Sequence, residues 1–119
     1  PVSLIAVYPS LIDLAGFETP KWLDGTSIMP QLAEPALPRG PAISSYGGGN
    51  TSIRTERWRY IRYEDGSEEL YDHHSDPNEW TNLADKPMHE ETKKMLARMI
   101  PTVQHPGLKV QSWFDKFQQ

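Results

Sequence analysis

Apolar and polar residues alternate between residues 52 and 72, and this alternation predicts β-strands. The segments 52–55, 58–63 and 68–72 are rich in β-branched and aromatic residues, which favour strands. Successive side chains of a strand point to opposite faces, so Trp58 and Tyr60 are expected on one face and Arg59 and Ile61 on the other. A further short strand is predicted over residues 41–46.

Turn residues divide these strands into hairpins. Asp65 and Gly66 predict a two-residue type I′ turn between the segments 58–63 and 68–72. Asp76 and Pro77 predict a further turn, because Asp bonds to local backbone and Pro fixes φ. The segment 18–40 contains several prolines and glycines and is expected to be loop-like, with a short helical turn around residues 27–32.

Two segments show the 3.6-residue period of helices. A helix over 87–100 is expected to begin at a proline in its first turn and to carry an apolar stripe, formed by Met88, Thr92, Met95, Leu96 and Met99. A second helix over 7–16 is apolar on most sides, which is typical of a helix buried in a larger body. Leu11, Ile12 and Leu14 are expected to remain uncovered in a chain of this size, and to make it self-associate.

These elements predict an α+β fold, with a small antiparallel sheet of about four strands packed against the C-terminal helix. The tail adds Trp113, Phe114 and Phe117, which are expected to anchor it to the body.

Composition narrows the possible functions of this 119-residue chain. Its net charge of −4 argues against binding to nucleic acid or to an anionic membrane. The absence of cysteine excludes disulfides and thiolate zinc sites. No apolar run approaches the roughly 20 residues that span a bilayer, and no signal peptide is visible after Pro1.

Three patterns suggest chemistry, and each has a structural alternative. Arginines alternate with aromatic residues over 54–63, which suggests single-stranded nucleic acid, but pairing with Glu56, Glu64, Glu68 and Glu69 is favoured. His73 and His74 suggest a metal, yet neighbouring residues of a strand point apart, so no metal site is expected. The segment 47–50 is either a loop that a ligand approaches closely or a flexible connection. No Gly-x-Ser-x-Gly nucleophile motif occurs.

Four blocks, in order, resemble the C-terminal part of sulfatases of the alkaline phosphatase superfamily, in particular iduronate-2-sulfatase-like and choline-sulfatase-like bacterial proteins. The segment 4–16 resembles the closing helix of their large catalytic domain, with Ala6 where Asp is usual. The segment 23–32 resembles their Leu-Asp-Gly-x-Ser stretch, and the segments 52–72 and 76–83 resemble their small sheet and its turn. The resemblance therefore implies two parts, with 1–40 ending the catalytic α/β domain and 41–119 forming the C-terminal subdomain.

In this family a formylglycine made from Cys or Ser, together with calcium, hydrolyses the sulfate ester. The resemblance places both in the N-terminal catalytic domain, which is the expected partner of this chain. The chain has neither the Cys/Ser-x-Pro/Ala-x-Arg motif nor calcium ligands that match, so we expect no activity from it alone. The longer protein that the resemblance implies, of which this chain would be a part, is expected to hydrolyse sulfate esters of a carbohydrate and to be periplasmic or secreted.

The resemblance also implies that loops of this subdomain wall the substrate pocket. The matching residues form one segment: Tyr46, Gly47, Gly48, Gly49, Asn50 and Thr51. Two alternatives remain. The chain is a binding module for nucleic acid or for a protein, or it belongs to another hydrolase of the superfamily, such as a phosphonate hydrolase.

Overall fold

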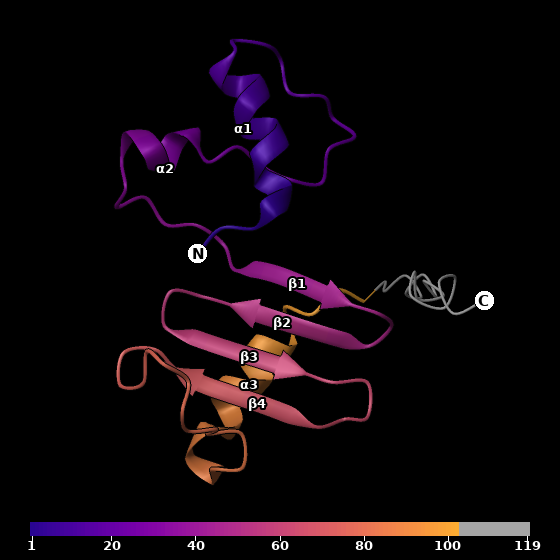
Figure 1. Cartoon of the computed structure of the whole chain (residues 1–119), viewed down its shortest axis with the longest axis vertical. Coiled ribbons are helices and arrows are strands. Elements are labelled where there is room, and N and C mark those ends of the chain that lie inside the picture. The colour runs from indigo at the N-terminus through magenta and orange to yellow at the C-terminus, as the bar shows by residue number, and fades with distance from the viewer. Residues whose placement is uncertain (103–119) are drawn as a thin grey trace, which may run out of the picture.

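A four-stranded antiparallel sheet is the centre of the computed structural model, which describes residues 1–102 (Figure 1). The strands β1 (Ala42–Tyr46), β2 (Asn50–Arg54), β3 (Trp58–Arg62) and β4 (Glu68–Asp72) lie in chain order. Each strand pairs with its neighbour in sequence, so the sheet is a simple meander. The predicted α+β class and the four strands are confirmed. The tail residues Trp113, Phe114 and Phe117 lie outside the described residues.

One face of the sheet carries the hydrophobic core. Tyr60 of β3 stands opposite Ile53 of β2 and Leu70 of β4, and all three side chains are fully buried. Leu96 packs on this row from the helix α3 (Glu90–Ala97). The period-two alternation of the strands thus places one apolar row against one helix, as the sequence predicts.

The C-terminal helix is shorter than expected. The 3₁₀ turn η2 (Pro87–His89) precedes α3, and the peptides of Met99 and Ile100 close three-residue turns after it. The predicted helix over 87–100 is therefore α-helical only in its middle, with tighter turns at both ends, which is common at helix termini. Its apolar stripe is also narrower, because Met88 and Met95 are exposed.

The N-terminal 40 residues lie beyond the β1 edge of the sheet (Figure 1). They form the 3₁₀ turn η1 (Leu4–Ala6) and the helices α1 (Val7–Leu14) and α2 (Met29–Ala33). The Ser10 hydroxyl connects these turns, since it donates to the Ala6 carbonyl at 2.6 Å and accepts from the Ile28 N–H at 3.0 Å. Leu11 and Leu14 are more than half exposed, as predicted, whereas Ile12 is half-buried.

Gly25 lies directly against the backbone of η1. A Cβ atom at this position would stand 2.0 Å from the Ile5 carbonyl oxygen. Real atoms do not approach so closely, so only glycine lets the segment around Gly25 pass η1 without a shift of the backbone. This contact explains why the glycine of the Leu23-Asp24-Gly25 stretch is required here.

The turn between β3 and β4 differs from the predicted type I′ turn. The Gly66 N–H donates to the Tyr63 carbonyl at 3.1 Å, and the Tyr63 N–H donates to Ser67 O at 2.9 Å. Gly66 has φ of 85°, but Asp65 is not among the residues with positive φ. The loop is thus one residue longer, with the glycine in the left-handed position that follows a type I turn. Asp65 instead accepts hydrogen bonds from both N–H and hydroxyl of Ser67.

The outer edge of β4 is closed by a side chain. Asn82 accepts from the Leu70 N–H at 3.0 Å and donates to the Glu68 carbonyl at 3.2 Å. The Leu83 N–H then donates to the Leu70 carbonyl at 2.8 Å. These bonds satisfy peptide groups that an edge strand otherwise leaves unpaired.

Candidate functional site

The segment 46–51, predicted to lie near a substrate, forms the hairpin between β1 and β2. Gly47 and Gly49 have φ of 61° and 91°, a conformation that side-chain-bearing residues rarely adopt. Tyr46 and Asn50 face each other across the hairpin, and the Asn50 amide donates to the Tyr46 carbonyl at 3.0 Å. The segment is therefore a hairpin connection, one of the two possibilities that the sequence allowed, and its place near a substrate stays a prediction.

This hairpin contacts the turn between β3 and β4, at the same end of the sheet. The Glu64 N–H donates to Asn50 Oδ1 at 3.2 Å. A Cβ on Gly49 would stand only 3.0 Å from the Glu64 Cβ, which shows how closely the two turns approach. Sequence reasoning missed the second turn as a neighbour of the candidate site, because only the three-dimensional pairing brings it there.

The six predicted residues have different environments. Tyr46 is 86% exposed, and Gly47 beside it is also exposed. Thr51 is buried, and its hydroxyl lies 3.4 Å from the Ser45 hydroxyl across the hairpin. Tyr46 and the glycine backbone are therefore the parts that a ligand can reach, whereas Asn50 and Thr51 hold the hairpin in shape.

The opposite face of the sheet, away from α3, carries a polar network. Arg54 donates to His73 Nδ1 at 2.9 Å, and the other ring nitrogen of His73 lies 2.6 Å from Glu79 Oε1. Arg59 reaches the same carboxylate at 3.1 Å. Glu79 has a positive φ of 59°, and these contacts hold its side chain in place. His73 thus has partners at both nitrogens.

The arginines pair with carboxylates other than the predicted ones. Arg57 pairs with Asp72 and Arg59 with Glu79, instead of with Glu56, Glu64, Glu68 or Glu69. The reason lies in the fold, because Asp72 and Glu79 come from β4 and the turn after it. With Arg54 held by His73, three of the four arginines over residues 54–62 bond within the chain.

Glu68 and Glu69 accept bonds from tyrosines instead. Glu68 accepts from the Tyr60 hydroxyl and from Lys93 at 2.8 Å, and the Lys93 bond lowers the pKa of Glu68 most. Burial, followed by the bond to Glu68, raises the pKa of Tyr60. Burial and the bond to Glu69 raise the pKa of Tyr71 to about 12. Glu68, Tyr60 and Tyr71 therefore do not have the pKa of a proton donor or acceptor that works near neutral pH.

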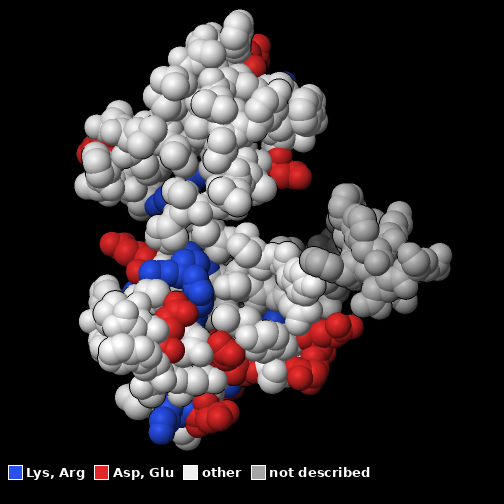
Figure 2. Space-filling model, viewed as in Figure 1, with Lys and Arg blue, Asp and Glu red and all other residues white. Residues whose placement is uncertain are grey.

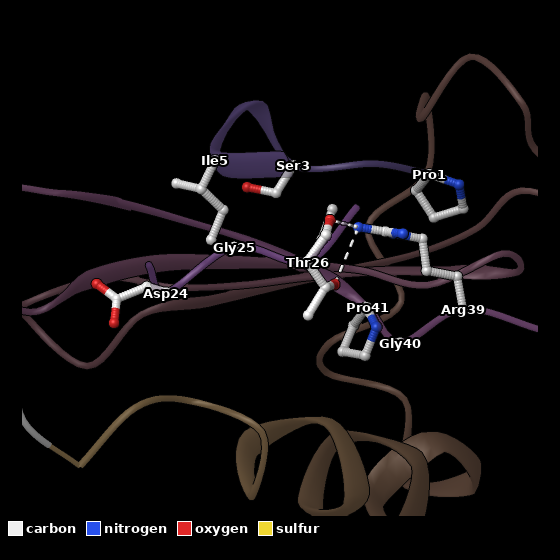
Figure 3. A pocket seen from close by; sticks show the side chains of 10 residues that line it. Pro1, Ser3, Ile5, Asp24, Gly25, Thr26, Arg39, Gly40 and Pro41 are labelled. Atoms are coloured by element: carbon white, nitrogen blue, oxygen red, sulfur yellow. Dashed lines mark hydrogen bonds between the residues drawn. The ribbon is translucent and has the colours of Figure 1, made fainter. Parts of the chain in front are cut away.

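A cavity of about 200 Å³ lies where the N-terminal part joins the sheet (Figure 3). Arg39 extends across it and donates to the Thr26 carbonyl at 2.9 Å and to the Ser27 carbonyl at 3.1 Å. Its guanidinium also reaches the Gln31 side chain at 3.1 Å. These bonds tie Arg39, just before the sheet, to the segment 26–31 of the same N-terminal part, so the guanidinium is occupied within the chain.

The described residues do not fit a formylglycine or calcium centre. Within residues 1–102, no three His, Asp or Glu side chains lie close enough together to hold a metal ion. The sequence has no cysteine either. We therefore assign no chemical step to this part. No helix within the described part has the length and apolar character needed to cross a bilayer.

Comparison with known proteins identifies the family. A sulfatase of Formosa agariphila is 34% identical over 102 residues, which are 85% of this chain and 20% of that protein. The choline-sulfatase of Rhizobium meliloti is 38% identical over 95 residues, 73% of this chain and 18% of that protein. The chain belongs to the sulfatase family. No family model matches it.

Solved structures share the fold of this sulfatase chain. One, in complex with its substrate D-glucosamine-2-N,6-O-disulfate, is 25% identical with a TM-score of 0.65, and the match covers 78% of this chain and 22% of that one. The phosphonate monoester hydrolase of Agrobacterium radiobacter matches in fold alone, with 23% identity, a TM-score of 0.62, and coverage of 78% of this chain and 23% of that one. The chain spans about a fifth of the length of the curated relatives it matches.

Proposed function

We propose that this chain is the C-terminal subdomain of a longer sulfatase that hydrolyses sulfate esters of a carbohydrate. The similarity to sulfatases over 85% of the chain carries this proposal. In it, residues 1–40 complete the catalytic domain, and the sheet with α3 forms a support docked on that domain. The remainder of the protein supplies the formylglycine and the calcium ion.

The N-terminal part supports the proposed docking. Leu4, Phe17 and Trp22 are each more than two-thirds exposed, and Leu11 and Leu14 lie on the same small body. Figure 2 shows few charged side chains over this part on the face in view, in contrast to the sheet. Large exposed apolar residues mark surfaces that another body covers. A catalytic domain of the same protein is the proposed cover.

The glycine hairpin is the proposed wall of the substrate pocket. Its backbone is fixed by Asn50, and its tip projects the exposed Tyr46. A turn of glycines lets a substrate approach the backbone, while an aromatic ring gives a face for a sugar ring. The carbohydrate class agrees with the disulfated glucosamine that one similar structure binds.

Activity of the full-length protein tests this function. We expect it to hydrolyse an aryl sulfate and a sulfated monosaccharide, and Tyr46→Ala to raise KM for the saccharide. Trp80→Ala is the matched control, because Trp80 is an aromatic residue that is 83% exposed and follows β4 at the opposite end of the sheet. A protein that hydrolyses an aryl phosphonate but no sulfate ester is the result that would favour the phosphonate hydrolase. An equal effect of both substitutions on KM would contradict the proposal that the hairpin lines the pocket.

A further inference from the structure

A cleft of about 710 Å³ lies between the turn that follows β3 and the end of α3. Its volume is in the range of sites that hold small ligands. Residues of three separate segments line it, including Gly49, Arg62, Glu64, Gly66 and Arg98. Gly49 belongs to the glycine hairpin, so the cleft adjoins the proposed wall of the substrate pocket.

Two arginines are among the residues that line this cleft. Arg62 ends β3, on the same face as Tyr60, and Arg98 directly follows α3. Within residues 1–102, neither forms an ion pair, whereas Arg57 and Arg59 do. Arg62 stands opposite Glu68 in the sheet, but the Glu68 oxygens are bound by Tyr60 and Lys93. The positive charge of Arg62 is therefore only partly offset by its neighbours.

Arginine suits an oxyanion because its planar fork donates two parallel hydrogen bonds. Glu64 is the single carboxylate among the described residues that line the cleft, against two guanidiniums. Gly66 adds a stretch of backbone without a side chain, and nothing lies within 4 Å of where its Cβ would stand, so a ligand can approach it closely. The cleft thus combines positive charge with room for a sugar-sized group.

We propose that this cleft binds a second anionic group of a sulfated saccharide, a sulfate or carboxylate other than the ester that is hydrolysed. This proposal rests on the proposed function, which brings a saccharide to the adjoining hairpin. Arg62 and Arg98 would each donate hydrogen bonds to this anionic group. Glu64 would repel any further anion placed beside it in the cleft. The cleft would then select saccharides that carry two negative groups over those that carry one.

Binding to the full-length protein tests the cleft without any need for turnover. The probe is a disulfated glucosamine, compared with a monosulfated glucosamine and with inorganic sulfate, by calorimetric titration. Replacing both arginines, Arg62→Gln with Arg98→Gln, should weaken the disulfated ligand about tenfold or more, since charge-assisted hydrogen bonds are lost. Binding of the monosulfated ligand should weaken much less. The variant Arg62→Lys keeps the charge without the fork and should give an intermediate loss.

The matched control removes the same charge elsewhere. Lys86→Gln with Lys94→Gln changes two exposed lysines outside the cleft and should leave both affinities unchanged. Equal losses in the two double variants would show a general charge effect and overturn the proposal, as would an unchanged affinity in the arginine variant. Inorganic sulfate bound as tightly as the disulfated glucosamine would overturn the saccharide assignment. Failure of the proposed function is seen separately, as absent aryl sulfate hydrolysis by the unmodified protein.

Discussion

Arg57 and Asp72 form a two-point ion pair at the end of the sheet opposite the glycine hairpin. The Arg57 Nε donates to Asp72 Oδ1 at 2.9 Å, and its Nη2 donates to Oδ2 at 2.7 Å. The same guanidinium lies 4.7 Å from the ring centre of Trp58. The pair joins the turn before β3 to the last residue of β4, and so fixes the register of the two strands.

This ion pair makes the stability of the fold depend on pH in the acid range. The bond to Arg57, more than any other cause, lowers the pKa of Asp72 from 3.8 to about 2. Because the pKa is lower in the folded state, the stabilisation is complete above about pH 4 and is lost as the pH falls toward 2. We expect Asp72→Asn to lower the melting temperature at pH 7 and to flatten this part of the curve of stability against pH. An unchanged acid limb in thermal melts would show that another carboxylate is responsible.

Gly25 does not have a positive φ, so a substitution there tests close packing alone. Gly25→Ala should destabilise the N-terminal part by about 1–3 kcal/mol, because the added Cβ meets the Ile5 carbonyl oxygen and the backbone must shift. Gly40→Ala is the control, since no atom lies within 4 Å of its added Cβ. Its effect should stay within about 0.5 kcal/mol. The measurement is limited proteolysis of residues 1–40, and equal cleavage rates in the two variants would contradict the contact.

Substitutions at Gly49 and Gly66 distinguish the cost of backbone strain from the cost of steric crowding. Both have positive φ, of 91° and 85°, but only an added Cβ on Gly49 meets a neighbour, Glu64. Gly66→Ala should therefore cost about 1 kcal/mol from its conformation alone. Gly49→Ala should cost more, and should also move the hairpin. Chemical denaturation gives both values, and a larger loss at Gly66 would mean that the two turns do not touch in solution.

The apolar N-terminal surface should make this chain self-associate when it is expressed alone. Leu11 and Leu14 of α1 are exposed and have no cover within residues 1–102. Leu11→Lys should shift the chain toward monomer in light scattering, while the circular dichroism of the sheet stays unchanged. Ile12→Lys should have a smaller effect on association, because Ile12 is half-buried and already in contact with its own chain. A wild-type chain that remains monomeric at high concentration would contradict this surface.

The sequence predicted the elements whose pattern is local, and failed where distant residues decide. The alternation around Tyr60 was enough for the strands and for the row that faces α3. The choice of Asp72 and Glu79 as arginine partners was not predictable, because the pairing of β4 and the turn after it bring them there. The left-handed conformation of Glu79 has no local signal in the sequence either. It is held by contacts to His73 and Arg59, which lie elsewhere in the chain.

For the candidate site, the sequence predicted the hairpin but not the separate roles of its residues. Thr51 is buried by the sheet, and Asn50 is occupied by the Glu64 peptide, so neither resembles the exposed Tyr46. The cleft beside the hairpin is lined by Arg62 and Arg98, which are 36 residues apart in sequence and come to one cleft only through the packing of α3 on the sheet. No pattern in either segment alone predicts this arrangement.

The side chain of Asn82 restricts the edge of the sheet at which a further strand can pair. Its amide copies the donor and acceptor of one peptide of a fifth strand, so β4 offers little to a foreign strand at that point. Strand addition, whether by the rest of a longer protein or by a misfolded copy, is left with the β1 side. A single side-chain amide therefore decides at which edge of the sheet another strand can pair. Its loss would make both edges of the sheet available to aggregation.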